Sequence, residues 1–323
     1  MKSRYPIWKK AKFLCRQIVP GNSRYGQIFF TKLCDRVCDY CRVANRETRD
    51  ISLKQWKRIA DTLRNWGVFY TSITGGEATI RKDLEEFISY LSRLSIFTSL
   101  NSNGDLLIPE RIDSLAKAGL CSLVISLDSL KTTEGTKSDP GKVFELLAYA
   151  KTKGIIPNVK AVINPHDSET TGALAKETVK REFFFSFEML QAVGGLFSRP
   201  SRHTRVISGM AQNQSGIWLP AELFQEATGI SWTWKCNPDR DNWITVNNDG
   251  TLMVCQEWGS DIPILSIERL DNPHWRGYKK DVVERCPGCF YGCYYEKELL
   301  SEHPLRIIRE ELLTFINAWR MLH

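Results

Sequence analysis

The sequence CDRVCDYC, residues 34–41, carries three cysteines separated by four and three positions. Thiols this close together can converge on one metal centre, and a chain in a reducing compartment rarely uses such a loop for disulfides. Three thiolates are one ligand short of a closed zinc site, and no other Cys or His lies nearby in the sequence. We therefore predict an iron–sulfur cluster with one iron open to an outside ligand. A zinc loop with a distant fourth ligand is the alternative, because thiolate number alone fixes the metal weakly.

The spacing C-x3-C-x2-C resembles the cluster motif of the radical S-adenosylmethionine (SAM) superfamily. The resemblance implies that Cys34, Cys38 and Cys41 hold a 4Fe-4S cluster whose open iron binds SAM. It also implies that Tyr40 lies beside the adenine of SAM. An electron from a donor such as flavodoxin or ferredoxin would then cleave SAM to methionine and a 5′-deoxyadenosyl radical.

The composition of the whole chain indicates a soluble globular protein. Of its 323 residues, 42% are hydrophobic and 25% are charged, and no apolar run approaches the roughly 20 residues of a membrane span. No secretory signal peptide is visible, and eight of the ten cysteines fall into two clusters with metal-like spacing. We therefore expect a cytoplasmic protein with no membrane contact.

The net charge of +7 has one local concentration, in the Lys- and Arg-rich residues 1–25. This segment has few aromatic residues between its basic ones, unlike a surface that stacks on bases. We expect a solvated basic arm, and nucleic acid is not an expected partner.

Strand-like and helix-like segments alternate along residues 26–193. A capping box at Ser52 and Gln55 predicts the start of one helix, and Pro109 and Gly119 predict the start and end of another. Strands are expected at residues 26–31, 68–74, 97–100, 123–127, 158–163 and 183–187. This alternation predicts an α/β fold with parallel strands and helical crossovers, which either an open doubly wound sheet or a barrel would satisfy.

Polar and glycine-rich residues follow the carboxyl ends of these strands, where α/β folds bind ligands. Gly75-Gly76-Glu77 resembles the radical SAM motif that meets the methionine amino group, because glycine allows close approach and a carboxylate complements an ammonium. The SAM-binding residues that the resemblance implies at these ends are Gly75, Gly76, Glu77, Ser102, Asn103, Ser126 and Asp128. It also implies the partial (β/α)6 barrel of that family over residues 26–193.

A second set of cysteines comprises Cys236, Cys255, Cys286, Cys289 and Cys293. Two β-rich runs around Asn-Asp-Gly predict a hairpin over residues 243–255, which returns Cys255 to the region of Cys236. This half resembles the auxiliary-cluster extensions called SPASM and twitch. The resemblance implies a small cysteine-rich domain over residues 231–300, with an auxiliary 4Fe-4S cluster on Cys236, Cys255, Cys286 and Cys289. A structural zinc ribbon on the same cysteines is the alternative. Cys293 is then either a replacement ligand or a free thiol that could donate a hydrogen atom.

The remaining segments carry weaker signals. Residues 194–230 are expected to form a linker or active-site loop, and residues 301–323 an amphipathic helix that packs on the barrel or docks a partner. Cys15 and Cys121 are expected to be buried cysteines with no role in metal binding.

These patterns predict a biosynthetic, oxidoreductase-like radical SAM enzyme that oxidises or rearranges a small polar metabolite such as a sugar, cyclitol or nucleoside. Only about 25 residues precede the first strand, too few for a peptide-recognition domain. The alternative is a maturase that cross-links or epimerises a ribosomally made peptide, and a non-catalytic metal-binding protein is a third hypothesis. The side chains that are candidates for a place near the site, without a ranked role, are His166, His203, Glu188 and Glu257.

Overall fold

The computed structural model describes residues 24–38, 41–44, 48–131, 138–163, 168–189 and 235–288 of the chain. The predictions that lie outside these residues concern most of the basic arm, Cys15, Tyr40, His166, the 194–230 segment, Cys289, Cys293 and the helix within 301–323.

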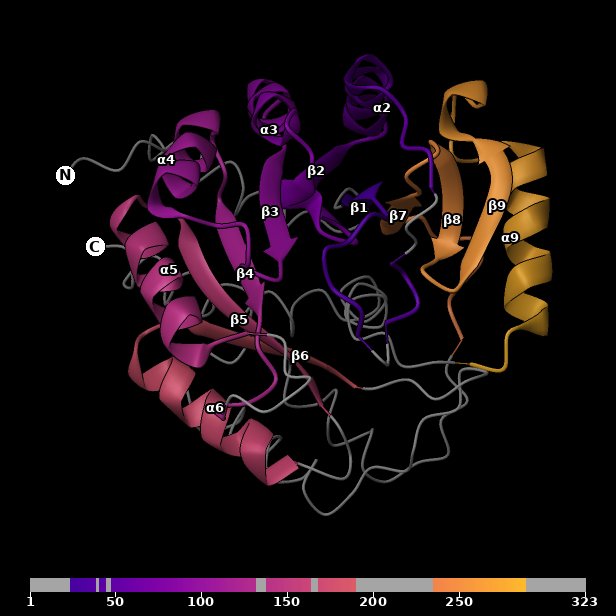
Figure 1. Cartoon of the computed structure of the whole chain (residues 1–323). Coiled ribbons are helices and arrows are strands. Elements are labelled where there is room, and N and C mark those ends of the chain that lie inside the picture. The colour runs from indigo at the N-terminus through magenta and orange to yellow at the C-terminus, as the bar shows by residue number, and fades with distance from the viewer. Residues whose placement is uncertain are drawn as a thin grey trace, which may run out of the picture.

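Nine strands of the described part form one curved sheet, in the order β6-β5-β4-β3-β2-β1-β7-β8-β9 (Figure 1). Their bounds are β1 Arg24–Thr31, β2 Val68–Gly75, β3 Phe97–Ser102, β4 Ser122–Ser126, β5 Ile156–Ile163, β6 Phe184–Met189, β7 Trp243–Val246, β8 Thr251–Cys255 and β9 Trp258–Pro263. Strands β1 to β6 pair in parallel with their neighbours. The predicted α/β fold with a parallel sheet is thereby confirmed.

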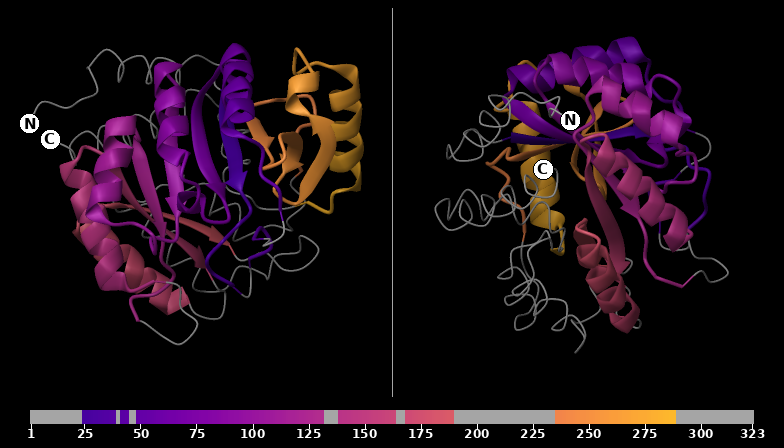
Figure 2. Two further views of the ribbon diagram at one scale, coloured as in Figure 1. Left: turned by 45° about the horizontal axis from the view of Figure 1, so that its top comes forward. Right: turned by 90° about the vertical axis from the view of Figure 1, so that its left-hand side faces the viewer.

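The helices that connect the parallel strands lie along the outer face of this sheet (Figures 1 and 2). They are α2 Leu53–Asn65, α3 Leu84–Arg93, α4 Pro109–Ala118, α5 Pro140–Thr152 and α6 Ser168–Lys180, with short 3-10 turns η1 Ala78–Ile80 and η2 Ile264–Ser266. Helix α9, Pro273–Arg285, packs beside β9 at the far end of the sheet. None of the helices in the described ranges is both long and apolar enough to cross a membrane.

Local sequence explains where two of these helices begin and end. Ser52 accepts from the Gln55 backbone N–H, and the Gln55 side chain accepts from the Ser52 backbone N–H, so the predicted capping box of α2 is present. Pro109 opens α4, and Gly119 closes it with a left-handed φ of 100°. Helices α6 and α9 were not predicted, because each has few apolar residues at helical spacing.

The two faces of the sheet differ in chemistry. On the outer face, Ile28 pairs with Ile73, which pairs with Leu100, and all three are fully buried under the helices. On the inner face, a row of polar side chains runs across five neighbouring strands, formed by Thr245, Gln27, Ser72, Ser99 and Ser122. The helices therefore cover an apolar surface, while the other face carries this polar row next to aromatic residues such as Tyr25 and Phe29.

The C-terminal strands continue the same sheet. Strand β7 pairs in parallel with β1, and β7, β8 and β9 pair antiparallel in turn. The predicted hairpin is present: β7 and β8 flank a turn closed by Gly250 at a φ of 83°. Strand β9, which the sequence reading missed, extends this hairpin away from β1.

Candidate functional site

The cysteine loop directly follows β1, at the edge where the parallel strands end. Cys34 and Cys38 are half-buried and Cys41 is exposed, and the Cys41 backbone N–H donates to the Cys38 carbonyl at 2.9 Å. Burial is the main reason that the pKa of the Cys34 thiol is raised. The three thiols therefore lie on one short loop beside the ends of β2 and β3.

Gly75 and Gly76 allow the chain that leads into this loop to pass against them. A Cβ on Gly75 would lie 2.0 Å from the Thr31 carbonyl oxygen, and one on Gly76 would lie 2.1 Å from that of Leu33. The Gly76 and Glu77 backbone N–H groups donate to these same two carbonyls, each at 2.8 Å. Glycine is therefore required at both positions by the close approach of another backbone segment. In this structure that segment is the protein's own chain at Thr31 and Leu33.

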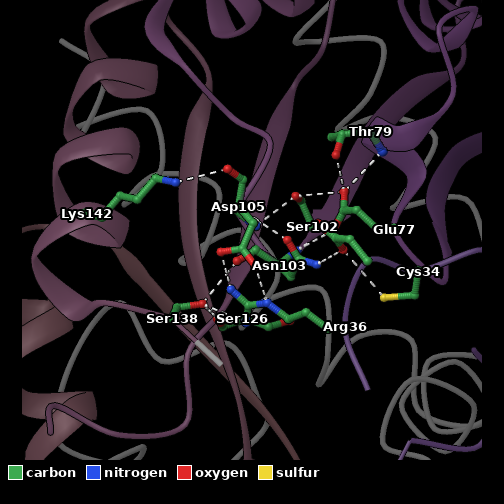
Figure 3. Close-up of polar contacts among 12 residues, drawn as sticks. Cys34, Arg36, Glu77, Thr79, Ser102, Asn103, Asp105, Ser126, Ser138 and Lys142 are labelled. Carbon is green, nitrogen blue, oxygen red and sulfur yellow. Dashed lines mark hydrogen bonds and ion pairs between the residues drawn. The ribbon is translucent and has the colours of Figure 1, made fainter. Parts of the chain in front are cut away.

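Glu77 is fully buried, and its carboxylate joins the ends of two strands (Figure 3). Its Oε1 accepts from the Thr79 backbone N–H at 3.1 Å, from the Thr79 hydroxyl and from the Ser102 hydroxyl at 3.0 Å. Its Oε2 accepts from the Asn103 backbone N–H at 2.7 Å. Burial outweighs these bonds and raises the pKa of the Glu77 carboxyl.

Ser102 is the last residue of β3 and donates to Glu77, and Asn103, which follows it, meets both Glu77 and the cysteine loop. The Asn103 side-chain amide donates to Asp35 Oδ1 at 2.7 Å, and its oxygen accepts from the Asp105 backbone N–H at 2.9 Å. Glu77, Ser102 and Asn103 are therefore brought together with the residue that follows Cys34.

Arg36, inside the cysteine loop, extends this network toward β4 (Figure 3). Its guanidinium donates from two nitrogens to both carboxylate oxygens of Asp105, and from Nη1 to the Ser138 hydroxyl at 3.2 Å. Lys142 Nζ donates to the Asp105 carbonyl at 3.0 Å. The sequence reading missed these residues, because ion pairs between distant segments leave no local pattern.

Ser126 and Asp128, predicted at the end of β4, lie beside this network. The Ser126 carbonyl is 3.2 Å from the Ser138 hydroxyl, and Asp128 Oδ1 accepts from the Val162 backbone N–H at 2.8 Å. Burial raises the pKa of the Asp128 carboxyl. On the neighbouring strands, Lys160 of β5 forms an ion pair with Glu188 of β6.

The C-terminal cysteines in the described ranges lie on three separate pieces of chain. Cys236 precedes β7, Cys255 ends β8, and Cys286 follows α9. Residues beside them are in contact: Lys235 Nζ donates to the Glu284 carbonyl at 2.9 Å, and the Arg285 guanidinium lies 5.8 Å from the ring centre of Trp258. Because Trp258 pairs with Cys255, these contacts bring all three pieces to one region.

A buried carboxylate, Asp241, fastens the Cys236 segment to α9. It forms ion pairs with Arg276 and with Lys279, whose side chain is only 7% exposed. Burial is the main reason that the pKa of the Lys279 amine is lowered. Another ion pair, Arg42 with Glu257 at 3.7 Å, joins the residue after Cys41 to the turn after Cys255.

The donor chemistry of the N-terminal loop fits an iron–sulfur cluster, since three thiols share one loop that contains no further Cys or His. Among the described residues, no three His, Cys, Asp or Glu side chains lie close enough to ligate a single ion. A 4Fe-4S cluster binds each thiolate at a different iron, so its ligands stand farther apart than those of one ion. Cys34, Cys38 and Cys41 are the residues that could hold it.

Comparisons with known proteins agree with this arrangement. Residues 28–175 match the model of the family described as the Radical SAM superfamily. PqqA peptide cyclase of Bradyrhizobium diazoefficiens is 34% identical over 142 residues, which cover 42% of this chain and 37% of that protein. Mycofactocin maturase MftC of Mycolicibacterium smegmatis is 34% identical over 100 residues, which cover 30% of this chain and 26% of that protein. The matches thus span well under half the length of these relatives.

A solved structure with a similar fold is that of Streptococcus suis SuiB bound to its precursor peptide SuiA. The TM-score is 0.63 at 20% identity, and the likeness covers 84% of this chain and 70% of that chain. It extends the similarity in fold beyond the region matched by the family model.

Proposed function

The chain contains a radical SAM domain, and we propose that it is a radical SAM enzyme that modifies a peptide. When bound by Cys34, Cys38 and Cys41, a 4Fe-4S cluster supplies an electron that cleaves SAM to methionine and a 5′-deoxyadenosyl radical. The observation that carries this proposal is the meeting of the cysteine loop with Glu77 and Asn103 at one edge of the sheet. That edge is where α/β folds bind ligands.

The protein's own residues would bind and orient SAM at this edge. Gly75 and Gly76 let the chain that leads into the cysteine loop lie against the end of β2, and Ser126 and Asp128 present oxygens beside the ends of β4 and β5. Asp128 carries a carboxylate suited to a hydroxyl or ammonium donor. Tyr40, Glu77, Ser102 and Asn103 complete the proposed SAM-binding set.

The sequence alone favoured a small polar metabolite, and the relatives favour a peptide. One relative bears the name of a peptide cyclase, one is a maturase, and the structural neighbour was solved with a precursor peptide. The row of polar side chains on the inner face would supply hydrogen-bond partners to either class of substrate, so the choice of a peptide rests on the relatives. Asn101 and Ser72, joined at 2.6 Å, are examples of such groups on that face.

An auxiliary 4Fe-4S cluster on Cys236, Cys255, Cys286 and Cys289 is part of the proposal. The contacts around Lys235 and Trp258 support it, since they draw three of these cysteines to one region. Such a centre would accept an electron from the substrate radical or orient the substrate. Cys293 is the candidate hydrogen-atom donor for an epimerising reaction, and a flavodoxin or ferredoxin remains the expected electron donor.

The first test is the iron and sulfide content after anaerobic reconstitution, with 5′-deoxyadenosine formation under dithionite and SAM. We expect about eight irons in the parent, and about four in a variant with Cys34, Cys38 and Cys41 replaced by Ala. That variant should form no 5′-deoxyadenosine. A parent that binds zinc in place of iron and leaves SAM intact would be a non-catalytic metal-binding protein.

The second test separates the two substrate classes. The reconstituted parent is incubated with SAM and either a defined library of synthetic peptides or a mixture of sugars, cyclitols and nucleosides. We expect 5′-deoxyadenosine to rise with peptides, together with a peptide that has lost two hydrogen atoms or changed configuration. A rise with the small metabolites alone would return the function to metabolite oxidation. A Cys293→Ala variant that still cleaves SAM but forms no epimerised peptide would assign Cys293 as the hydrogen-atom donor.

A further inference from the structure

The cysteine loop shows an inverted pattern of exposure at Arg36 and Val37. The Arg36 side chain is 12% exposed, whereas the neighbouring Val37 is 76% exposed. A charged side chain normally stays in water unless it is paired, and an apolar one gains free energy by burial. A specific set of partners must therefore hold Arg36 inward.

Those partners are two residues from different parts of the chain. Arg36 donates to both carboxylate oxygens of Asp105, which follows β3, and to the hydroxyl of Ser138, which precedes α5. The Ser138 hydroxyl in turn lies 3.0 Å from the carbonyl of Asn103 and 3.2 Å from that of Ser126. Arg36 thus ties the cysteine loop to the ends of β3 and β4 and to the start of α5 (Figure 3).

A second tie comes from the preceding residue. Asp35 accepts from the Asn103 side-chain amide at 2.7 Å, so residues 35 and 36 are both bonded to the segment after β3. These two residues lie between Cys34 and Cys38. Two bonds from adjacent residues fix both the position and the rotation of the loop, since a single bond would still allow it to pivot.

We propose that Arg36, paired with Asp105, is a positioning residue that presents Cys34 and Cys38 to the iron–sulfur cluster and to SAM. The proposal rests on the function proposed above. A planar guanidinium with two parallel bonds to a carboxylate supplies directional restraint that a lysine would not. Groups that orient metal ligands in this way typically change metal affinity about 10–100-fold.

The test compares the reconstituted full-length parent with Arg36→Ala and Asp105→Asn. One readout is the rate at which a chelator removes iron, and the other is the change that SAM causes in the electron paramagnetic resonance signal of the reduced protein. The SAM-sensitive signal reports the N-terminal cluster and excludes an auxiliary one. We expect the iron responsible for that signal to be lost about tenfold faster in both variants, with a weaker response to SAM.

Arg111→Ala is the matched control. Arg111 of α4 also forms a paired contact with a carboxylate, Glu85 of α3, but on the outer layer of helices. The control should lose stability in urea as Arg36→Ala does, yet keep the parent's rate of iron loss and response to SAM. This separates positioning of the cluster from a general effect on folding.

Should Arg36→Ala fail to fold by circular dichroism, Ser138→Ala removes one partner and leaves the ion pair, and a faster iron loss is still expected. Folded variants with the parent's iron-loss rate and SAM response would overturn the positioning role. A parent that shows no SAM-sensitive signal would overturn the proposed function itself, together with this inference.

Discussion

Each of the two cysteine regions is organised around one buried carboxylate, and the partners of the two carboxylates differ in kind. Glu77, beside the N-terminal loop, accepts from hydroxyls and backbone N–H groups. Asp241, beside the C-terminal cysteines, is paired with the cations Arg276 and Lys279. Neutral donors at the strand ends suit a site that must exchange ligands, whereas a buried ion triad fixes one segment to one helix.

The largest effect is expected from Asp241→Ala. Removing this carboxylate leaves the Lys279 charge buried without its counter-ion, although the Arg240 carbonyl still accepts from it, and costs about 3–5 kcal/mol of unfolding free energy. Urea unfolding followed by circular dichroism measures the change. A loss below about 1 kcal/mol would show that Arg276 and Lys279 find other partners, and the contrast with the Glu77 region would disappear.

A smaller effect is expected from Gly76→Ala in the N-terminal region. Its new Cβ would lie 2.1 Å from the Leu33 carbonyl oxygen, so the cysteine loop has to move. This should lower the unfolding free energy by about 2–3 kcal/mol. The matched control is Gly277→Ala in α9, which meets nothing within 4 Å. The unfolding free energy of this control should rise by about 1 kcal/mol, because alanine has a higher helix propensity than glycine. Equal effects of the two substitutions on the urea midpoint would contradict the tight approach at Gly76.

The next effect is the pH dependence introduced by Glu77. Because burial raises its folded-state pKa above the ordinary 4.5, Glu77 contributes most to stability below pH 4.5. That contribution is lost as the pH rises through the folded-state pKa. Glu77→Gln cannot ionise and lacks one acceptor, so it should be less stable by about 1–2 kcal/mol at low pH. The difference in unfolding free energy between parent and variant should narrow toward neutral pH, as measured by urea unfolding at a series of pH values. A difference that widens with pH would mean that folding lowers the pKa of Glu77.

The smallest effect is expected from Lys280→Ala. Lys280 pairs with Asp239 at 3.3 Å, but both side chains are more than half exposed. Its loss should change the unfolding free energy by less than about 1 kcal/mol, and salt should reduce even that difference. A loss as large as that of Asp241→Ala would mean that exposed ion pairs, and not the buried triad, hold α9 in place.

The sequence predicted what depends on short-range rules. Ser52, Pro109 and Gly119 mark helix ends through bonds within a few residues, and the turn at Gly250 follows from its own backbone. The three cysteines of residues 34–41 are visible because a single loop carries them. The periodicity of apolar residues was enough to predict the parallel sheet, since each strand and helix buries one face.

The parts that were missed depend on contacts between distant segments. Arg36 meets Asp105 across 69 positions, and Asp241 meets Lys279 across 38, so neither pair leaves a local pattern. Helix α9 has a lysine among its buried positions, which removes the apolar repeat that would have predicted it. Strand β9 has exposed or half-exposed residues at most positions and lacks a buried run.

The pairing of β1 with β7 has a consequence for how the chain is made. One edge of β1 has no partner until Trp243–Val246 has been synthesised, long after β2 has covered the other edge. On the ribosome the nascent sheet therefore carries an open strand edge, which is prone to pair with other chains. A chain stopped before residue 243 would keep that edge, so premature termination in the C-terminal half endangers the N-terminal half as well.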